Sequence, residues 1–247
     1  QQHPGWCTVI EDHWVTISEE LSNLVSPINP IGSHVQLGGG RHNMTNSWTV
    51  VGSGARGSGG DDHRVVSAGG KWTEYVLFGT GAQPTDHDVP FTKKLLRDHA
   101  PDAVSLATAG GGEVIFSRLA PKTHIEAHCG PTNFRLTCHL GLVVPNNKAT
   151  TEENDVDGRG NKCGVGSGKC QIRVGHAWHS WQRGQVIVFD DSWEHEVLND
   201  TDEERIVLLL RFWHPSLKQQ QQHYEHHLER ARQGKESAVS KRYHPPN

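Results

Sequence analysis

The sequence has no long apolar run and no excess of basic residues. None of its 247 residues falls in a continuous apolar stretch of roughly 18 or more, so no segment of this chain is expected to cross a membrane as a helix. There are 24 Lys and Arg against 28 Asp and Glu, and no long block carries one sign. Nucleic-acid binding needs a basic surface, so nucleic acid is excluded as an expected partner.

Sulfur-containing residues are scarce. The chain has one Met and five Cys, and the odd number leaves at least one thiol without a partner in the chain. Cys163 and Cys170 flank a Gly-rich turn and are candidates for a small disulfide loop. Asn43 and Asn199 begin Asn-x-Thr triplets, which would permit glycosylation in a secretory compartment. Because such triplets occur often by chance, both a secretory and a cytoplasmic location stay open.

Glycine is abundant, but two Gly-containing motifs do not form the sites they resemble. Residues 52–57 read GSGARG, formally a dinucleotide-binding motif, yet the following SGGDDH cannot begin the helix that such a loop needs. Residues 155–160 read DVDGRG, the start of a calcium loop. The twelfth position of that loop is Gly166, where a bidentate Glu is required. Neither a nucleotide nor a calcium loop is expected.

The second half of the chain is a succession of short β-rich runs separated by turn residues. The runs are Glu113–Leu119, Phe134–Val144, Gln171–Val174, Gln185–Phe189, His195–Leu198 and Arg205–Trp213. This pattern predicts an antiparallel sandwich or a jelly-roll-like barrel. Upstream, the spacing of apolar residues predicts a short helix over Ile17–Leu24, a strand over Lys71–Phe78 and a helix over Phe91–His99 that Pro101 stops.

These elements divide the chain into three parts. We expect residues 1–70 to be a loop-rich N-terminal extension packed on the core. Residues 71–215 should form the β domain, interrupted by a polar insertion at 146–169. Residues 216–247 should form a polar C-terminal helix and tail.

Several polar side chains are expected to gather on one face of the β domain. In an extended chain side chains alternate, so THIEAH should place His124, Glu126 and His128 on the same side. The same rule groups three residues of the next run: Arg135, Thr137 and His139. Downstream, FDDSWEHEV brings three more candidates into a tight turn between two strands: Asp190, Asp191 and His195.

The order of His128, His195 and Arg205 is typical of iron oxygenases. In those enzymes two separated histidines bind iron, and an arginine about ten residues later holds the distal carboxylate of 2-oxoglutarate, which its planar fork suits. Arg205 also heads a strongly apolar run, where a charge is costly without an anion. Spacing alone equally fits two hydrogen-bonded histidines and an arginine in a salt bridge.

Three stretches resemble the aspartyl/asparaginyl β-hydroxylase family: HCGPTNFRLTCHLGLVVP, GQVIVFDDSWEHEV and RFWHP. The resemblance covers roughly residues 72–215. It implies a mainly β, double-stranded β-helix (jelly-roll or cupin-like) fold with flanking helices. It also implies a dioxygenase that uses Fe(II), 2-oxoglutarate and dioxygen to hydroxylate a C–H bond. By this likeness His128 and His195 bind the iron, and Arg205 binds the distal carboxylate of 2-oxoglutarate.

The resemblance implies further roles around the cosubstrate. Ser117 would assist Arg205, and His139 would lie near the other end of 2-oxoglutarate, supported by Arg135. Asp191 could orient a metal-bound water, although turn capping is expected of either Asp190 or Asp191.

This chain departs from the family at two basic positions. Thr137, on the cosubstrate side of the site, replaces a second arginine, and Ile115 stands where a lysine is common. Two basic groups expected around acidic ligands are therefore absent. The substrate is expected to be either a peptide Asp or Asn residue or an amino-acid-derived small molecule.

Gly130 stands two residues after His128, where the usual iron site has a carboxylate. Water, as in the family resembled, a halide, as in a halogenase, or Glu126 could complete the site. A catalytically inactive ligand-binding member and a zinc site are alternatives. Cys129 and Cys138 are the nearby zinc-binding candidates, but alternation points them away from the histidine face.

Overall fold

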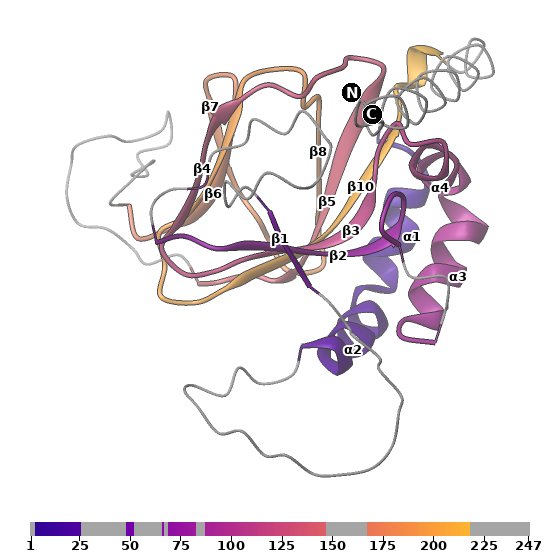
Figure 1. Ribbon diagram of the computed structural model, residues 1–247, viewed down its shortest axis with the longest axis horizontal. Helices are drawn as coiled ribbons and strands as arrows, with labels where there is room; N and C mark the ends of the chain where they lie inside the picture. Colours follow the sequence, from indigo (N-terminus) through magenta and orange to yellow (C-terminus); the bar gives the residue numbers. More distant parts are fainter. Residues whose placement is uncertain are drawn as a thin grey trace, which may run out of the picture.

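The computed structural model describes residues 3–25, 48–51, 66, 69–82, 87–146 and 167–217. Within these ranges the helices are α1 (Trp6–Asp12), α2 (Trp14–Leu24), α3 (Pro90–His99), α4 (Pro101–Thr108) and a short 3-10 turn, Pro215–Leu217 (Figure 1). The strands are β1 (Thr49–Val51), β2 (Trp72–Phe78), β3 (Val114–Leu119), β4 (Thr123–His128), β5 (Arg135–Val143), β6 (Cys170–Val174), β7 (Ala177–Ser180), β8 (Val186–Phe189), β9 (His195–Asn199) and β10 (Arg205–Trp213).

The strands form two facing antiparallel sheets. One sheet has the order β1-β2-β3-β10-β5-β8, and the other has the order β4-β9-β6-β7. From β3 to β10 the chain passes back and forth between the sheets, so that β3 lies beside β10 and β4 beside β9, although each pair is distant in sequence (Figure 1). β6 and β7 are consecutive and form a hairpin. This is the topology of a double-stranded β-helix, which confirms the predicted fold class.

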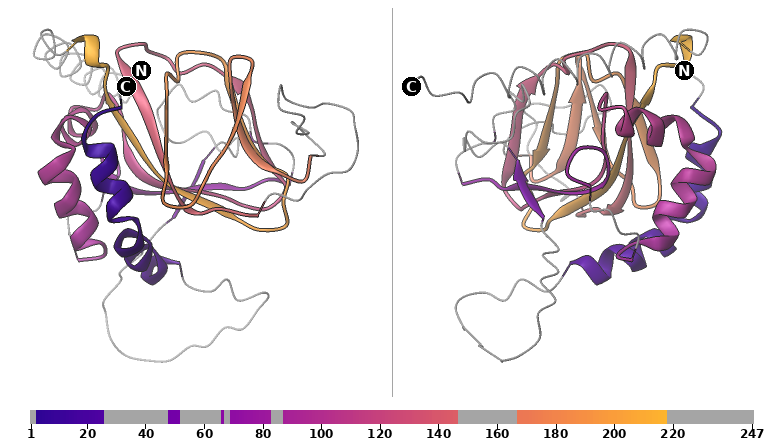
Figure 2. Two further views of the ribbon diagram at one scale, coloured as in Figure 1. Left: turned by 180° about the vertical axis from the view of Figure 1, so that it is seen from behind. Right: turned by 45° about the vertical axis from the view of Figure 1, so that its right-hand side comes forward.

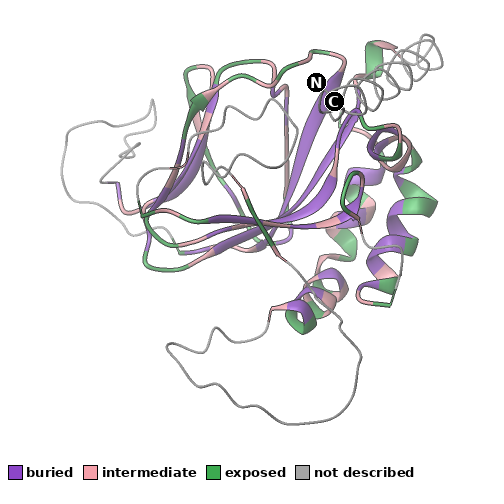
Figure 3. Cartoon of the chain, in the orientation of Figure 1, coloured by how far each residue is buried: buried purple, intermediate pink, exposed green. Residues whose placement is uncertain are grey.

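Apolar side chains pack on both faces of the six-stranded sheet. Its inner face meets the second sheet around Ile115, Ile125, Ile172 and Phe189. Its outer face is covered by the four helices, which gather on one side of the sandwich (Figure 2). Every residue of β10 is buried, which fits an RIVLLLRFW run with cover on both sides (Figure 3).

The helical layer is larger than predicted. Residues 6–24, expected to hold one short helix in a loop-rich extension, form two helices that bury Trp6, Ile10 and Ile17 against the sheet. The helix predicted over Phe91–His99 is present as α3, which ends at His99 before Pro101 as expected. Pro101 also occupies the first turn of α4, a helix that was not predicted, where its missing N–H costs no hydrogen bond.

The strand predictions agree with the observed bounds to within a residue or two, but β1, β4 and β7 were not among the predicted runs. The predicted C-terminal helix, most of the 146–169 insertion, Cys163 and Asn43 lie outside the described residues. Asn199 is buried, and its amide donates to the carbonyls of Ala120 (3.0 Å) and Glu203 (2.8 Å). That triplet therefore has a structural role and is not accessible for glycosylation in the fold. In the described part of the chain no helix is both long and apolar enough to cross a membrane.

Candidate functional site

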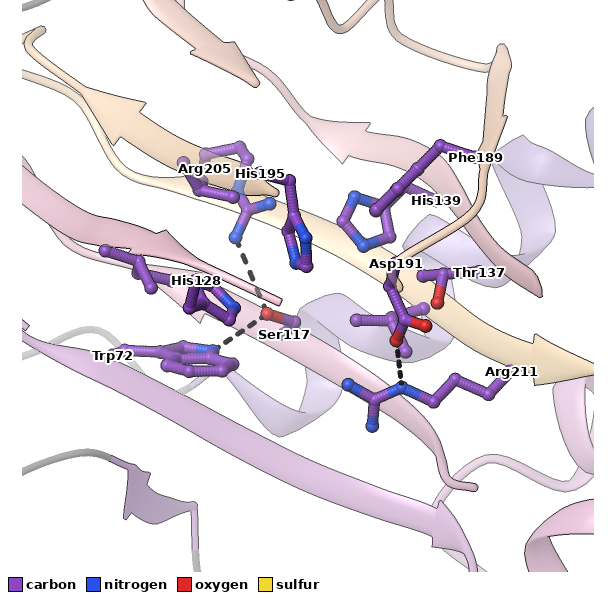
Figure 4. A pocket seen from close by; sticks show the side chains of 13 residues that line it. Trp72, Ser117, His128, Thr137, His139, Phe189, Asp191, His195, Arg205 and Arg211 are labelled. Atoms are coloured by element: carbon purple, nitrogen blue, oxygen red, sulfur yellow. Dashed lines mark hydrogen bonds and ion pairs between the residues drawn. The ribbon is translucent and has the colours of Figure 1, made fainter. Parts of the chain in front are cut away.

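A pocket lies between the two sheets, lined by inward-facing side chains from both (Figure 4). The lining residues are Trp72, Ser117, Ile125, His128, Thr137, His139, Phe189, Asp191, His195, Val197, Arg205, Leu209 and Arg211. Most of the polar residues selected from the sequence are therefore brought together in one place.

A β-bulge in β4 decides which residues of this strand reach the pocket. From Ile125 to His128 the strand advances three residues while its partner β9 advances two. Ile125 and His128 therefore both face inward, whereas His124 lies on the outer face with Glu196, at 2.8 Å. The expectation that His124, Glu126 and His128 share a face is wrong, because one extra residue reverses the alternation.

The rings of His128 and His195 lie next to each other, with centroids 4.2 Å apart. His128 Nδ1 lies 2.7 Å from the carbonyl oxygen of Glu126, and His195 Nδ1 lies 2.8 Å from that of Trp193. A carbonyl only accepts, so each Nδ1 carries the hydrogen and each Nε2 is the basic nitrogen. This is the tautomer that a metal-binding histidine requires.

Carboxylates and thiols do not complete a larger metal cluster. In the ranges that the structure describes, no group of three or more His, Cys, Asp or Glu side chains is placed to hold a metal ion. Glu126 is exposed on the outer face, which removes it as a third ligand. Cys129 is exposed and Cys138 packs in the helical core, so neither lines the pocket and a zinc site with cysteine ligands is contradicted.

Gly130 is required because Asp191 occupies the space beside it. A Cβ atom at Gly130 would lie 2.8 Å from Asp191 Cγ and 2.7 Å from its carbonyl oxygen. Asp191 Oδ2 accepts hydrogen bonds from Arg135 and Arg211, each at 3.3 Å. Its Oδ1 is buried and has no partner within the described residues. A carboxylate thus lies next to the two histidines, but it comes from residue 191 and not from residue 130.

Arg205 lies at the opposite end of the pocket and is 1% exposed. Its guanidinium carbon lies 4.7 Å from the centre of the Trp181 ring, and its Nη2 is 3.5 Å from Ser117 Oγ, which also accepts a hydrogen bond from Trp72 Nε1 at 2.9 Å (Figure 4). Burial lowers the pKa of Arg205 to about 10, so it remains a cation at neutral pH. Within the described part of the chain no carboxylate pairs with it, and its Nε is buried without a partner.

His139 and Thr137 supply further unpaired polar atoms. The His139 ring contacts Phe189 edge to face, at 5.1 Å between centroids. Burial, followed by the charges of Arg205 and His195, holds the pKa of His139 well below its usual value, so its ring is neutral. His139 Nδ1 and Thr137 Oγ1 are buried and have no partner among the residues described. Such atoms are rare in folded proteins, and a polar ligand would satisfy them.

Two predicted residues have other positions or roles. Arg135 is not part of the pocket lining and reaches the site through Asp191, while its Nη1 donates to the carbonyl of Gly111 at 2.8 Å. Asp190 is the turn-capping aspartate, since its Oδ1 accepts from the backbone N–H (2.9 Å) and hydroxyl (2.6 Å) of Ser192.

Sequence reasoning missed Trp72, Trp181 and Arg211. Alternation along β10 could have found Arg211, because it lies six residues after Arg205 and therefore on the same face of the strand. No comparable pattern marks the two tryptophans, which come from segments on either side of the pocket.

Comparisons with known proteins point to one family. The family model described as Aspartyl/Asparaginyl beta-hydroxylase matches residues 11–215. The mouse protein named Aspartyl/asparaginyl beta-hydroxylase is 32% identical over 156 residues, 62% of this chain and 17% of the relative. The Ornithine lipid ester-linked acyl 2-hydroxylase of Rhizobium tropici is 33% identical over 156 residues, 62% of this chain and 46% of the relative. The chain thus spans less than half the length of either relative. A Pseudomonas putida prolyl-4-hydroxylase structure matches 58% of this chain and 72% of that one, at 15% identity and a TM-score of 0.33.

Proposed function

The chain belongs to the aspartyl/asparaginyl beta-hydroxylase family, and from this premise we propose that it is an Fe(II)- and 2-oxoglutarate-dependent dioxygenase that hydroxylates an unactivated C–H bond. One observation carries the proposal. A pair of histidines with correctly oriented rings shares a pocket with a buried arginine that lacks a carboxylate partner among the described residues. The first feature suits a metal ion and the second suits an anionic cosubstrate.

His128 and His195 would hold the iron through Nε2. When bound, Fe(II) supplies the activation of dioxygen that couples oxidation of 2-oxoglutarate to succinate and CO₂ with hydroxylation of the substrate. Asp191 Oδ1 would accept a hydrogen bond from a water that completes the site, which gives its buried, unpartnered oxygen a role. The carbonyls of Glu126 and Trp193 keep both rings in the metal-binding tautomer.

Arg205 and Ser117 would bind the distal carboxylate of 2-oxoglutarate. The Trp181 ring backs the guanidinium and restricts its orientation. His139 and Thr137, farther along the inner face, would donate hydrogen bonds to the other end of the cosubstrate. Phe189 and Trp72 close the walls around these groups, so that water is excluded and charge–charge contacts are strong.

We do not favour a halide at the third iron position. The space beside Gly130 is filled by the Asp191 carboxylate, whose Oδ1 lies 2.8 Å from the position of a Cβ atom at residue 130. A halide there would meet a carboxylate of the same charge sign in a buried pocket, which is unfavourable.

The direct test is production of succinate from 2-oxoglutarate by the purified chain with Fe(II) and dioxygen. Slow turnover without a primary substrate is expected for the wild type, and none under argon. His128→Ala and His195→Ala should lose both iron and turnover, because each removes half of the protein ligands. Glu126→Ala is the matched control and should retain both, since Glu126 is exposed on the outer face. Absence of succinate from a folded, iron-loaded protein would refute the proposal.

A further inference from the structure

We infer that Arg211 forms an anion-binding subsite at the end of the pocket opposite Arg205, where it binds a carboxylate of the substrate. The inference rests on the proposed function and specifies the substrate class of the same site. It predicts a substrate that resembles aspartate at this point, with a carboxylate where asparagine would present a neutral amide.

The position of Arg211 follows from β10. Side chains six residues apart lie on the same face of a strand and are separated by roughly 20 Å along it. Arg205 and Arg211 both line the pocket, one beside Ser117 and the other beside Asp191 (Figure 4). With a cosubstrate carboxylate at Arg205, Arg211 is the cation at the other end of the cavity.

The strand register explains how Arg211 compensates for Thr137. Arg211 of β10 is directly paired with Thr137 of β5, the position where the sequence departs from its family by lacking an arginine. Paired residues on neighbouring antiparallel strands lie about 5 Å apart and project to the same side of the sheet. A guanidinium from position 211 thus reaches the same part of the pocket as one from position 137 would. In this chain the cation of that region is carried by β10 and not by β5.

A ligand carboxylate can replace one of the two carboxylates that contact Arg211. Its Nε donates to Asp191 Oδ2 at 3.3 Å, and its Nη1 donates to the carboxylate of Glu113. The side chain of Arg211 is 10% exposed, whereas that of Glu113 is 38% exposed. Losing its contact with Arg211 therefore costs Glu113 little free energy, because water can solvate its carboxylate. A substrate carboxylate replaces it, while Arg135 continues to hold Asp191.

The loop before β3 is shaped around this arginine. A Cβ atom at Gly112 would lie 2.8 Å from the Cβ of Arg211, so only glycine leaves room for the strand at that point. The backbone N–H of Arg211 donates to the carbonyl of Glu113 (3.1 Å), and the carbonyl of the preceding glycine, Gly111, accepts from Arg135 Nη1. Both arginines on this side of the pocket are thus positioned by the backbone of one Gly-rich loop.

The test compares two probes that differ only in charge at the recognised group. These are the α-amides of N-acetyl-L-aspartate and N-acetyl-L-asparagine, titrated by calorimetry into protein saturated with 2-oxoglutarate and Mn(II) under argon. The wild type should bind the acid about tenfold or more tightly than the amide, as expected for a hydrogen-bonded charge pair. Arg211→Thr should bring the ratio to about one. The exchanged double variant Thr137→Arg/Arg211→Thr should restore the preference, because the arginine then projects from the paired position.

Three results would overturn the subsite: no acid preference in the wild type, a preserved preference in Arg211→Thr, or no binding of either probe at millimolar concentration. Glu113→Gln provides a second measurement if Arg211→Thr does not fold. It removes the competing carboxylate and should tighten acid binding several-fold without tightening amide binding, and equal changes for both probes would contradict the inference. Acid preference without succinate production would refute only the proposed function, and succinate production without acid preference would refute only the subsite.

Discussion

Arg205 has opposite effects on binding and on stability. A buried cation without an anionic partner costs free energy of folding, and replacing it with an apolar side chain of similar length removes that cost. We expect Arg205→Met to raise the free energy of unfolding by about 1–3 kcal/mol in the absence of ligand. The same variant should lose 2-oxoglutarate binding, because the distal carboxylate then has no cation.

Denaturant unfolding and calorimetric titration of 2-oxoglutarate measure these two effects separately. Ser117→Ala is the matched control. It removes a weaker contact of the same guanidinium, at 3.5 Å, and leaves the buried charge in place. It should therefore weaken cosubstrate binding modestly without stabilising the fold. A decrease in stability on Arg205→Met would show that Trp181 and Ser117 already compensate the charge.

At the scale of single residues, the sequence indicated which side chains form the site. It said less about how these side chains interact. The histidine pair, Arg205 and Ser117 were selected from motifs and do share one pocket. Arg211 was missed because a charged residue near the end of an apolar strand also fits a solvated strand end. The crowding between Gly130 and Asp191 was equally out of reach, because 60 residues separate them in sequence and only the fold brings them together.

At the scale of strands, the bulge in β4 is what turns His128 into the pocket. Deleting Ala127 would remove the extra residue, so that the histidine follows Ile125 by two positions and regular alternation keeps it on the inner face opposite His195. The deletion variant should therefore stay folded, since β4 keeps its partner β9, and should bind iron about as well as the wild type. Metal content after dialysis against excess Fe(II) under argon measures this.

Deleting both Glu126 and Ala127 is the contrasting variant, because the histidine then follows Ile125 directly and alternation places it on the outer face. It should lose iron. If the single deletion loses iron as well, or if the double deletion keeps it, the alternation along β4 does not control the position of His128.

The same bulge marks the limit of pattern-based prediction for strands. Local composition, through turn residues and β-branched or aromatic runs, located seven of the described strands. A bulge depends on pairing with a strand some 70 residues away, here His128 with His195, and leaves no trace in local composition. His128 was therefore selected correctly from the run THIEAH, but regular alternation from His124 was the wrong reason.

At the scale of the whole molecule, the site depends on the helical layer behind it. β5 carries Thr137 and His139 on its inner face and Leu136, Cys138 and Leu140 on its outer face, where the helices pack. Of the two helices in the first 25 residues, the sequence indicated only the second half of α2, Ile17–Leu24. α1 is seven residues long, too short for a clear periodic pattern, and such a helix is stabilised by packing more than by propensity.

Ile17 tests whether this layer unfolds together with the sandwich. It is fully buried in α2, within the core shared by the helices and the outer face of β5, whereas Val15 in the same helix is 49% exposed. Ile17→Ala should lower the free energy of unfolding by about 2–4 kcal/mol, through lost burial and a cavity. Val15→Ala, the control, should change it by less than about 0.5 kcal/mol. Denaturant unfolding followed by tryptophan fluorescence and by far-UV circular dichroism should give one coincident transition in both variants. Separate transitions, or equal effects of the two substitutions, would show that the helices dock on an independently stable sandwich and do not help to position Thr137 and His139.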